Sequence, residues 1–219
     1  MPRPVLFVLA GVNGAGKSSI GGQLLLSAGL AWFNPDTLAR ELVAELGYPQ
    51  TEANALAWQE GVRRLDAALA ARHSHAFETT LGGNAMPAKI KAAVATHDVL
   101  MWYCGLSSPE QHIARVKARV AMGGHDIPEA KIHERWRSSL RNLIELLPHL
   151  AHLQTYDNSQ DVAVGSPLPD PVLVAEMRAG RMVWPKPKPK PEPKVLGATP
   201  HWAKPLVEAM LQLQDQRRR

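Results

Sequence analysis

The segment Gly11–Ser18, which reads GVNGAGKS, constrains the fold of this chain more than any other part of its sequence. The apolar run Val5–Ala10 precedes it and predicts a buried strand, and a helical pattern over Lys17–Ala28 follows it. Glycines in such a loop let successive backbone N–H groups turn inward around an anion, a geometry that side chains obstruct. This order of strand, loop and helix predicts a P-loop at the edge of a parallel sheet.

The residue types of this loop suit a nucleotide's phosphates. We expect Lys17 to reach the β- and γ-phosphates of ATP, and the Ser18 hydroxyl to ligate Mg²⁺. The alternative is a glycine-rich turn with a chance lysine. The motif leaves the acceptor of the phosphate open, because ATPases, GTPases and kinases share it. The residues expected to bind ATP are Gly11, Asn13, Gly14, Ala15, Gly16, Lys17, Ser18 and Ser19.

Short apolar runs alternate with helical patterns through most of the sequence, which predicts an α/β fold with a mainly parallel sheet and helices on both faces, in three layers. The five expected strands are Val5–Ala10, Ala31–Phe33, His75–Glu78, Val99–Leu106 and Leu153–Tyr156. The expected helices are Lys17–Ala28, Pro35–Leu46, Thr51–Arg72, Pro87–Thr96, Pro109–Met122 and Ile127–Leu147. Capping residues before proline mark two of the starts, at Asn34 and Ser108.

The C-terminal part of the chain changes in composition. Pro171–Met177 and Arg181–Trp184 predict a hairpin that turns at glycine and edges the domain. Proline then alternates with charge over Pro185–Lys194, which predicts an extended spacer. From Thr199 a short amphipathic helix is expected, which docks in cis, pairs in a dimer or binds another protein. The expected division is a kinase-type domain over 1–184, a linker over 185–194 and a helical appendage over 195–219.

Acidic residues lie at or just after the ends of two of the expected strands. Asp36 begins the helix after Ala31–Phe33, on the same sheet edge as the P-loop, where its carboxylate would take a hydroxyl proton as general base or position a metal. Glu78 ends a buried strand, and a carboxylate there is expected to meet a metal or substrate. Thr79 and Thr80 add hydroxyls, so that Asp36, Glu78, Thr79 and Thr80 are the expected substrate side. The structural alternatives are a favourable acid in a first helical turn and a capped turn.

Basic residues line the two helices after the fourth expected strand. Arg119 and Arg135 lie on either side of the glycine connection 123–124, so the two helices are expected to form a lid that supplies cations to the γ-phosphate. For Arg115, Arg137 and Arg141 a solvated basic face is an equal alternative. His125, in the connection itself, is expected either to contact substrate or to be a simple loop residue.

Composition limits the class of protein. The chain has 219 residues, a formal charge of +5 and one cysteine, Cys104, so an internal disulfide is excluded. No run approaches the about 20 apolar residues that span a bilayer, and we expect a cytoplasmic location without a membrane partner. An anionic partner suits the charge, but a nucleotide meets that need and part of the excess lies in the tails, so nucleic acid is not expected.

Taken together, these segments resemble the zeta-toxin-like P-loop kinases from Val5 to about Ser159. The resemblance is carried by Gly11–Ser18, Phe33–Asp36, Phe77–Gly82, Arg115–Val120, Gly123–Pro128 with Arg135, and Tyr156–Ser159. It implies a nucleotide-kinase-like fold that uses ATP and Mg²⁺. It also implies the catalytic residues Asp36 as base, Lys17 in the P-loop, and Arg119 and Arg135 in the lid.

The acceptor that the resemblance implies is a hydroxyl of a UDP-activated sugar such as UDP-N-acetylglucosamine, in a toxin held by an antitoxin protein. This chain is shorter than the larger zeta toxins, and its glycine-histidine lid differs from theirs. The open alternatives are a P-loop kinase for a nucleoside, an antibiotic or a polynucleotide end, and a nucleotide-dependent interaction module that presents its C-terminal helix to a partner.

Overall fold

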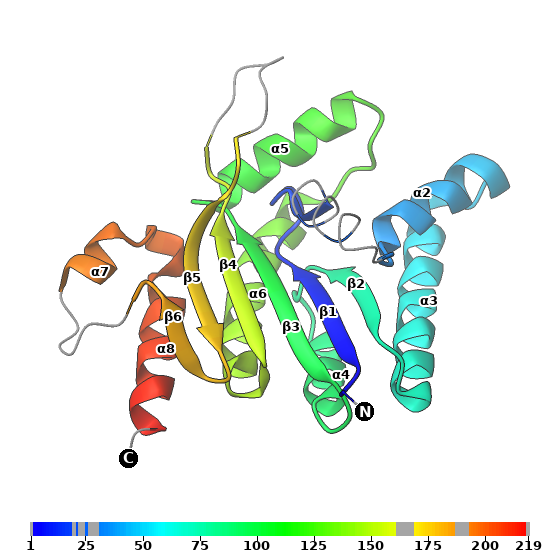
Figure 1. Ribbon diagram of the computed structural model, residues 1–219. Helices are drawn as coiled ribbons and strands as arrows, with labels where there is room; N and C mark the ends of the chain where they lie inside the picture. The colour runs from blue at the N-terminus through cyan, green and yellow to red at the C-terminus, as the bar shows by residue number, and fades with distance from the viewer. Residues whose placement is uncertain are drawn as a thin grey trace.

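The computed structural model describes residues 2–18, 21, 25, 31–160, 169–186 and 193–217. Its centre is a six-stranded sheet in the order β2-β1-β3-β4-β5-β6 (Figure 1). The strands are β1 (Val5–Ala10), β2 (His75–Thr79), β3 (Asp98–Gly105), β4 (His152–Asp157), β5 (Val172–Arg178) and β6 (Arg181–Trp184). The first four are mutually parallel, and the β5–β6 hairpin extends the sheet in antiparallel pairing.

The prediction of a mainly parallel α/β sheet is confirmed, but the count of five strands is wrong. Of the expected strand Ala31–Phe33, only Phe33 pairs, in an isolated bridge to Phe77. The reason is local: Asn34 caps the next helix at once, with its side chain accepting a hydrogen bond from the Asp36 N–H. The chain therefore leaves the sheet after one residue, while the hairpin adds two strands.

The helices are close to those expected, apart from their ends. They are α2 (Pro35–Leu46), α3 (Gln50–Ala71), α4 (Ala85–Ala93), α5 (Pro109–Ala121), α6 (Glu129–Leu146), α7 (Pro193–Ala198) and α8 (Lys204–Gln216), with short 3₁₀ turns at Leu147–His149 and His201–Ala203. Ser108 caps α5 through the Gln111 N–H, as predicted. The helix α6 begins two residues late, because the Asp126 carboxylate accepts from the adjacent Ile127 N–H instead of capping the first turn.

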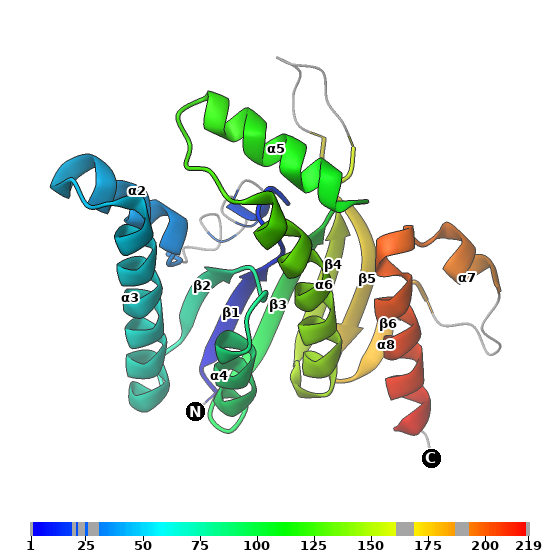
Figure 2. The same ribbon diagram turned by 180° about the vertical axis from the view of Figure 1, so that it is seen from behind.

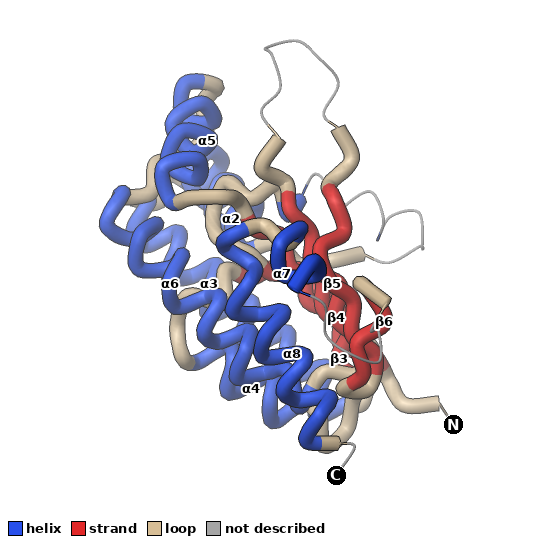
Figure 3. Tube along the Cα trace, turned by 90° about the vertical axis from the view of Figure 1, so that its left-hand side faces the viewer, coloured by secondary structure: helices blue, strands red, loops and turns tan. Residues whose placement is uncertain are grey.

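One face of the sheet carries the main core. In Figures 2 and 3 the helices α4, α6 and α8 pack side by side over this face, and α3 lies along the β2 edge. The core residues from the strands include Leu6, Val8, Met101, Leu153 and Met177. The expected third layer is the helix Lys17–Ala28, most of which lies outside the described residues. On that second face Leu9 and Leu25 pack with partly buried Phe7, Trp32 and Trp102.

The C-terminal segment is part of this core. The side chains of Leu206, Val207 and Met210 in α8 are completely buried against the sheet and α6. The expected spacer is shorter than its sequence suggested, since α7 begins at Pro193 and includes Lys194. Proline fits that position because the first residue of a helix needs no N–H donor. Residues 187–192 of the expected linker lie outside the described part of the chain.

Candidate active site

The P-loop follows β1 and turns on glycines with left-handed backbone. The φ angles of Gly11, Gly14 and Gly16 are 140°, 82° and 84°, values that other residues rarely adopt. A Cβ on Gly11 would lie 2.2 Å from the Cys104 carbonyl oxygen of β3, so even alanine is excluded there. These residues meet the geometric needs of a phosphate loop. Ser19, also expected to bind ATP, lies outside the described residues.

Four polar side chains meet at the end of this loop. Lys17 Nζ lies 3.5 Å from Glu78 Oε1, and both side chains are only 7% exposed. Ser18 Oγ donates to Glu78 Oε2 at 2.9 Å, and Asn34 Nδ2 donates to the same oxygen at 3.0 Å. The parallel register of β1 and β2 sets Glu78 opposite Leu9, two residues before the loop. Glu78 was expected on the substrate side. It also lies against the residues expected to bind phosphate and metal.

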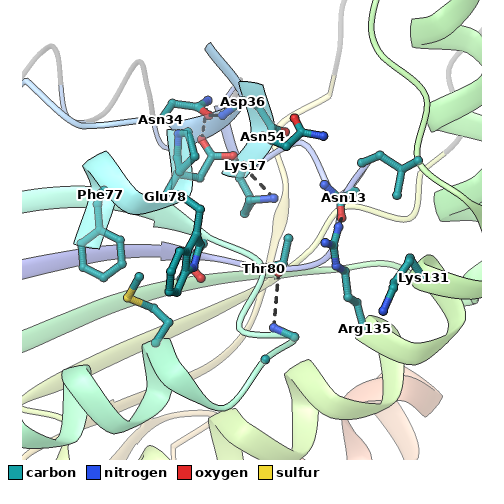
Figure 4. A pocket seen from close by; sticks show the side chains of 18 of the residues that line it. Asn13, Lys17, Asn34, Asp36, Asn54, Phe77, Glu78, Thr80, Lys131 and Arg135 are labelled. Carbon is teal, nitrogen blue, oxygen red and sulfur yellow. Dashed lines mark hydrogen bonds and ion pairs between the residues drawn. The ribbon is translucent and has the colours of Figure 1, made fainter. Parts of the chain in front are cut away.

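The P-loop opens into a cleft of about 480 Å³ (Figure 4). Its walls come from the P-loop, the end of β2 with the turn after it, the starts of α2 and α4, one face of α3, and the connection into α6 with the first turns of that helix. The expected site residues that line it are Asn13, Lys17, Asp36, Glu78, Thr79, Thr80, His125 and Arg135. Thus residues from five separate segments share one cavity.

The two arginines expected in the lid approach the cleft from α5 and α6. Arg119 Nη1 lies 4.0 Å from Asp36 Oδ2, a half-exposed pair, while its Nη2 donates to the His125 carbonyl. Arg135 Nη1 donates to Asn13 Oδ1 in the P-loop at 2.7 Å. Gly82 makes room for this arginine, since a Cβ there would lie 2.5 Å from Arg135 Cγ. Burial lowers the pKa of the His125 imidazole, which the Asp36 carboxylate offsets in part.

The other arginines of α5 and α6 fall into two groups, one bonded to the turn after β4 and one exposed to solvent. Arg115 Nη2 donates to the carbonyl oxygens of Asn158 and Gln160, so it anchors the turn after β4 and does not belong to a solvated face. Arg137 and Arg141 are exposed, as the alternative of a solvated basic face predicted.

Trp58 is a cleft residue that the sequence interpretation missed. It is 48% exposed, and it lines the cleft with Asn54 and Gly61 from the same helix. Their spacing of four and three residues, one helical face, was the available signal. Trp32 is not among the residues that line the cleft, and it packs instead against the cluster of Leu9 and Leu25 on the second face of the sheet.

The oxygen donors beside the P-loop suit Mg²⁺. The Ser18 hydroxyl and the Glu78 carboxylate are hard ligands that converge on one point, and Mg²⁺ is bound in kinases through one or two carboxylates together with substrate phosphates. Among the described residues there is no cluster of three or more histidine, cysteine, aspartate or glutamate side chains placed to hold a metal by protein ligands alone.

None of the described helices is long and apolar enough to cross a membrane.

No protein-family model matches this sequence, and no curated protein matches it. Solved structures do share its fold. A chain of the AvrRxo1-ORF1:AvrRxo1-ORF2 complex crystallised with ATP superposes with a TM-score of 0.58 at 18% identity, over 82% of this chain and 60% of that one. This chain therefore spans less than two thirds of that relative.

Two further structures have the same fold at similar identity. A protein of the PezAT chromosomal toxin–antitoxin system of Streptococcus pneumoniae gives a TM-score of 0.55 at 16% identity, covering 72% of this chain and 68% of that one. A putative kinase from Chloroflexus aurantiacus gives 0.51 at 17% identity, covering 62% and 80%. The likeness establishes a fold shared with a putative kinase and with a protein of a toxin–antitoxin system.

Proposed function

We propose that this chain is an ATP-dependent kinase of the zeta-toxin type, which transfers the γ-phosphate to a hydroxyl of a small-molecule acceptor. The observation that carries the proposal is the convergence of Lys17, Asp36 and Arg135 on one cleft, with Arg119 paired to Asp36 at its rim. A base, a phosphate loop and two cations are the parts that phosphoryl transfer needs.

Each residue has a role in the transfer. The P-loop N–H groups and Lys17 would hold the β- and γ-phosphates, after the Lys17 ammonium leaves Glu78. Asp36 would take the proton of the acceptor hydroxyl as its oxygen bonds to the γ-phosphorus and the bond from that phosphorus to the leaving oxygen of ADP breaks. Arg119 and Arg135 would neutralise charge on the transferring group. Ser18 and Glu78 would hold Mg²⁺, whose charge offsets that of the phosphates when it is bound.

The acceptor end of the cleft combines aromatic and amide side chains. Phe33, Phe77 and Trp58 line it together with Asn54 and Asn84. An acceptor with a planar ring and hydrogen-bonding edges suits these walls, because bases stack on aromatic faces. Together with the family resemblance, this favours a UDP-activated sugar such as UDP-N-acetylglucosamine. By the same resemblance, and because the PezAT relative belongs to a toxin–antitoxin system, we propose that an antitoxin protein is a partner.

Mass spectrometry tests the proposal directly. The protein is incubated with ATP, Mg²⁺ and a panel of UDP-sugars, and then with a whole-metabolite extract and a 5′-hydroxyl oligonucleotide. A gain of one phosphate on a UDP-sugar is expected. A gain only on another compound would overturn the acceptor assignment, and no gain on any compound would overturn the kinase assignment.

The role of Asp36 has a separate test. Asp36→Asn keeps the size of the side chain and removes the base, so kcat is expected to fall by about 10²–10⁴-fold while ATP binding is kept. The matched control is Asp66→Asn. Asp66 is a surface carboxylate on the far part of α3, where it pairs with Lys89 of α4. Unchanged turnover in Asp36→Asn would exclude Asp36 as the base.

A further inference from the structure

Two peptide units of the P-loop are held by side chains from outside the loop. His112 Nδ1 donates to the Asn13 carbonyl oxygen at 2.8 Å, and Asn158 Nδ2 donates to the Ala15 carbonyl oxygen at 3.0 Å. In a trans peptide the C=O and the following N–H point in opposite directions. Fixing these two carbonyls therefore turns the N–H groups of Gly14 and Gly16 to the opposite side of the loop.

The turn that carries Asn158 is itself held on three sides. The Asn158 backbone N–H donates to the Gly105 carbonyl at the end of β3, at 3.0 Å. From α5, Arg115 Nη2 donates to the Asn158 carbonyl at 2.8 Å. On the third side, the indole Nε1 of Trp202 donates to Asp157 Oδ1 at 3.0 Å, and the Ser159 hydroxyl donates to the same carboxylate oxygen.

Trp202 comes from the far end of the chain, in the 3₁₀ turn before α8. Its side chain is 5% exposed and lies on Gly105, where a Cβ would be 2.3 Å from the indole ring. The Tyr103 ring lies beside it, with the ring centroids 6.1 Å apart. The indole is therefore both packed and hydrogen-bonded, which fixes the position of Asp157 at the end of β4.

We propose that Asn158 and Trp202 are positioning residues of the nucleotide site. Asn158 orients the Ala15–Gly16 peptide toward the phosphates, and the C-terminal segment supports this turn through Trp202 and Asp157. This assigns to the 3₁₀ turn His201–Ala203, through Trp202, a part in nucleotide binding. The inference depends on the proposed function only in requiring that the P-loop binds ATP.

Direct binding of ATP with Mg²⁺, measured by calorimetry on the full chain, tests the proposal. Asn158→Ala removes the donor to Ala15 and is expected to raise the Kd for ATP about tenfold. Trp202→Phe keeps a ring on Gly105 but removes the N–H, and the Kd for ATP is expected to rise about threefold. Trp184→Phe is the control, because this exposed indole of β6 is not among the residues that line the cleft.

Two further readouts separate positioning from general stability. The melting temperature is measured for each variant, and the KM for ATP is expected to rise while the acceptor KM and kcat stay unchanged. Wild-type protein that fails to bind ATP would overturn the proposed function. Wild-type protein that binds ATP, with variants that bind equally well, would overturn only this inference. A lower melting temperature with an unchanged Kd in Trp202→Phe would likewise refute the role of Trp202.

Discussion

His112 lies beneath the P-loop with 1% of its surface exposed, and it holds the Asn13 carbonyl with one ring nitrogen. Burial lowers the pKa of its imidazole to about 4, an effect that the hydrogen bond to Asn13 offsets in part. The ring is thus neutral in the folded protein at pH 7. In the unfolded chain it takes a proton near pH 6.5.

A pH-dependent stability follows from this difference. The pKa of His112 is lower in the folded protein than in the unfolded chain, so its contribution to the free energy of unfolding is complete above pH 6.5. As the pH falls toward 4, this one group lowers the free energy of unfolding by about 3 kcal/mol. We expect denaturant unfolding at pH 7, 5 and 4 to show that the free energy of unfolding falls less with pH in His112→Gln than in the wild type. The control is His201→Gln, at an exposed ring. If the free energy of unfolding fell equally with pH in the wild type and in His112→Gln, the assignment of this pH dependence to His112 would be contradicted.

Gly11 provides a second prediction at the residue scale. Gly11→Ala combines a φ of 140° with a Cβ 2.2 Å from a backbone oxygen of β3, so loss of ATP binding and a destabilisation of about 3 kcal/mol or more are expected. At Gly47, with a φ of 69° and open space around it, alanine should cost only about 1 kcal/mol. Thermal unfolding of the two variants checks the comparison, and equal costs would mean that the contact with β3 is unimportant.

At the scale of the elements, α8 places Leu206, Val207 and Met210 in the main core. Leu206 is completely buried, so Leu206→Ala is expected to cost about 2–5 kcal/mol. Leu46, at the end of α2, is 67% exposed, and Leu46→Ala should change stability by less than about 0.5 kcal/mol. Urea unfolding distinguishes them. A mild effect of Leu206→Ala would mean that α8 is only loosely attached.

The elements also show where local sequence signals suffice. Asn34 and Ser108 cap α2 and α5 as predicted, because a side-chain cap acts within three residues of the chain. Asp126 stands three residues before Glu129, as Ser108 stands three residues before Gln111, but the Asp126 carboxylate accepts from the next N–H and α6 begins later. The failed strand Ala31–Phe33 has a similar cause, since a strong helix start directly after it limits pairing to one bridge.

For the whole molecule, the structure predicts what happens when the C-terminal segment is removed. Truncation after Trp184 would expose the core surface that Trp202, Leu206 and Met210 cover, so aggregation or a large fall in melting temperature is expected. Size-exclusion chromatography and thermal unfolding are the measurements. A stable, monomeric, fully active truncated protein would instead favour the alternative in which this helix serves to bind a partner.

The sequence by itself determined the P-loop, the parallel strands β1 to β4, the hairpin and most helix positions, because each depends on periodicity or on contacts a few residues apart. Tertiary structure alone decided that Glu78 meets Ser18, that Trp58 lines the cleft and that Trp202 reaches Asp157, since these contacts join segments 45 or more residues apart or depend on how whole elements pack. The glycine-rich loop is thus recognisable on its own. The orientation of its peptides rests on α5, the turn after β4 and the C-terminal segment, because only their packing brings the donors to the loop.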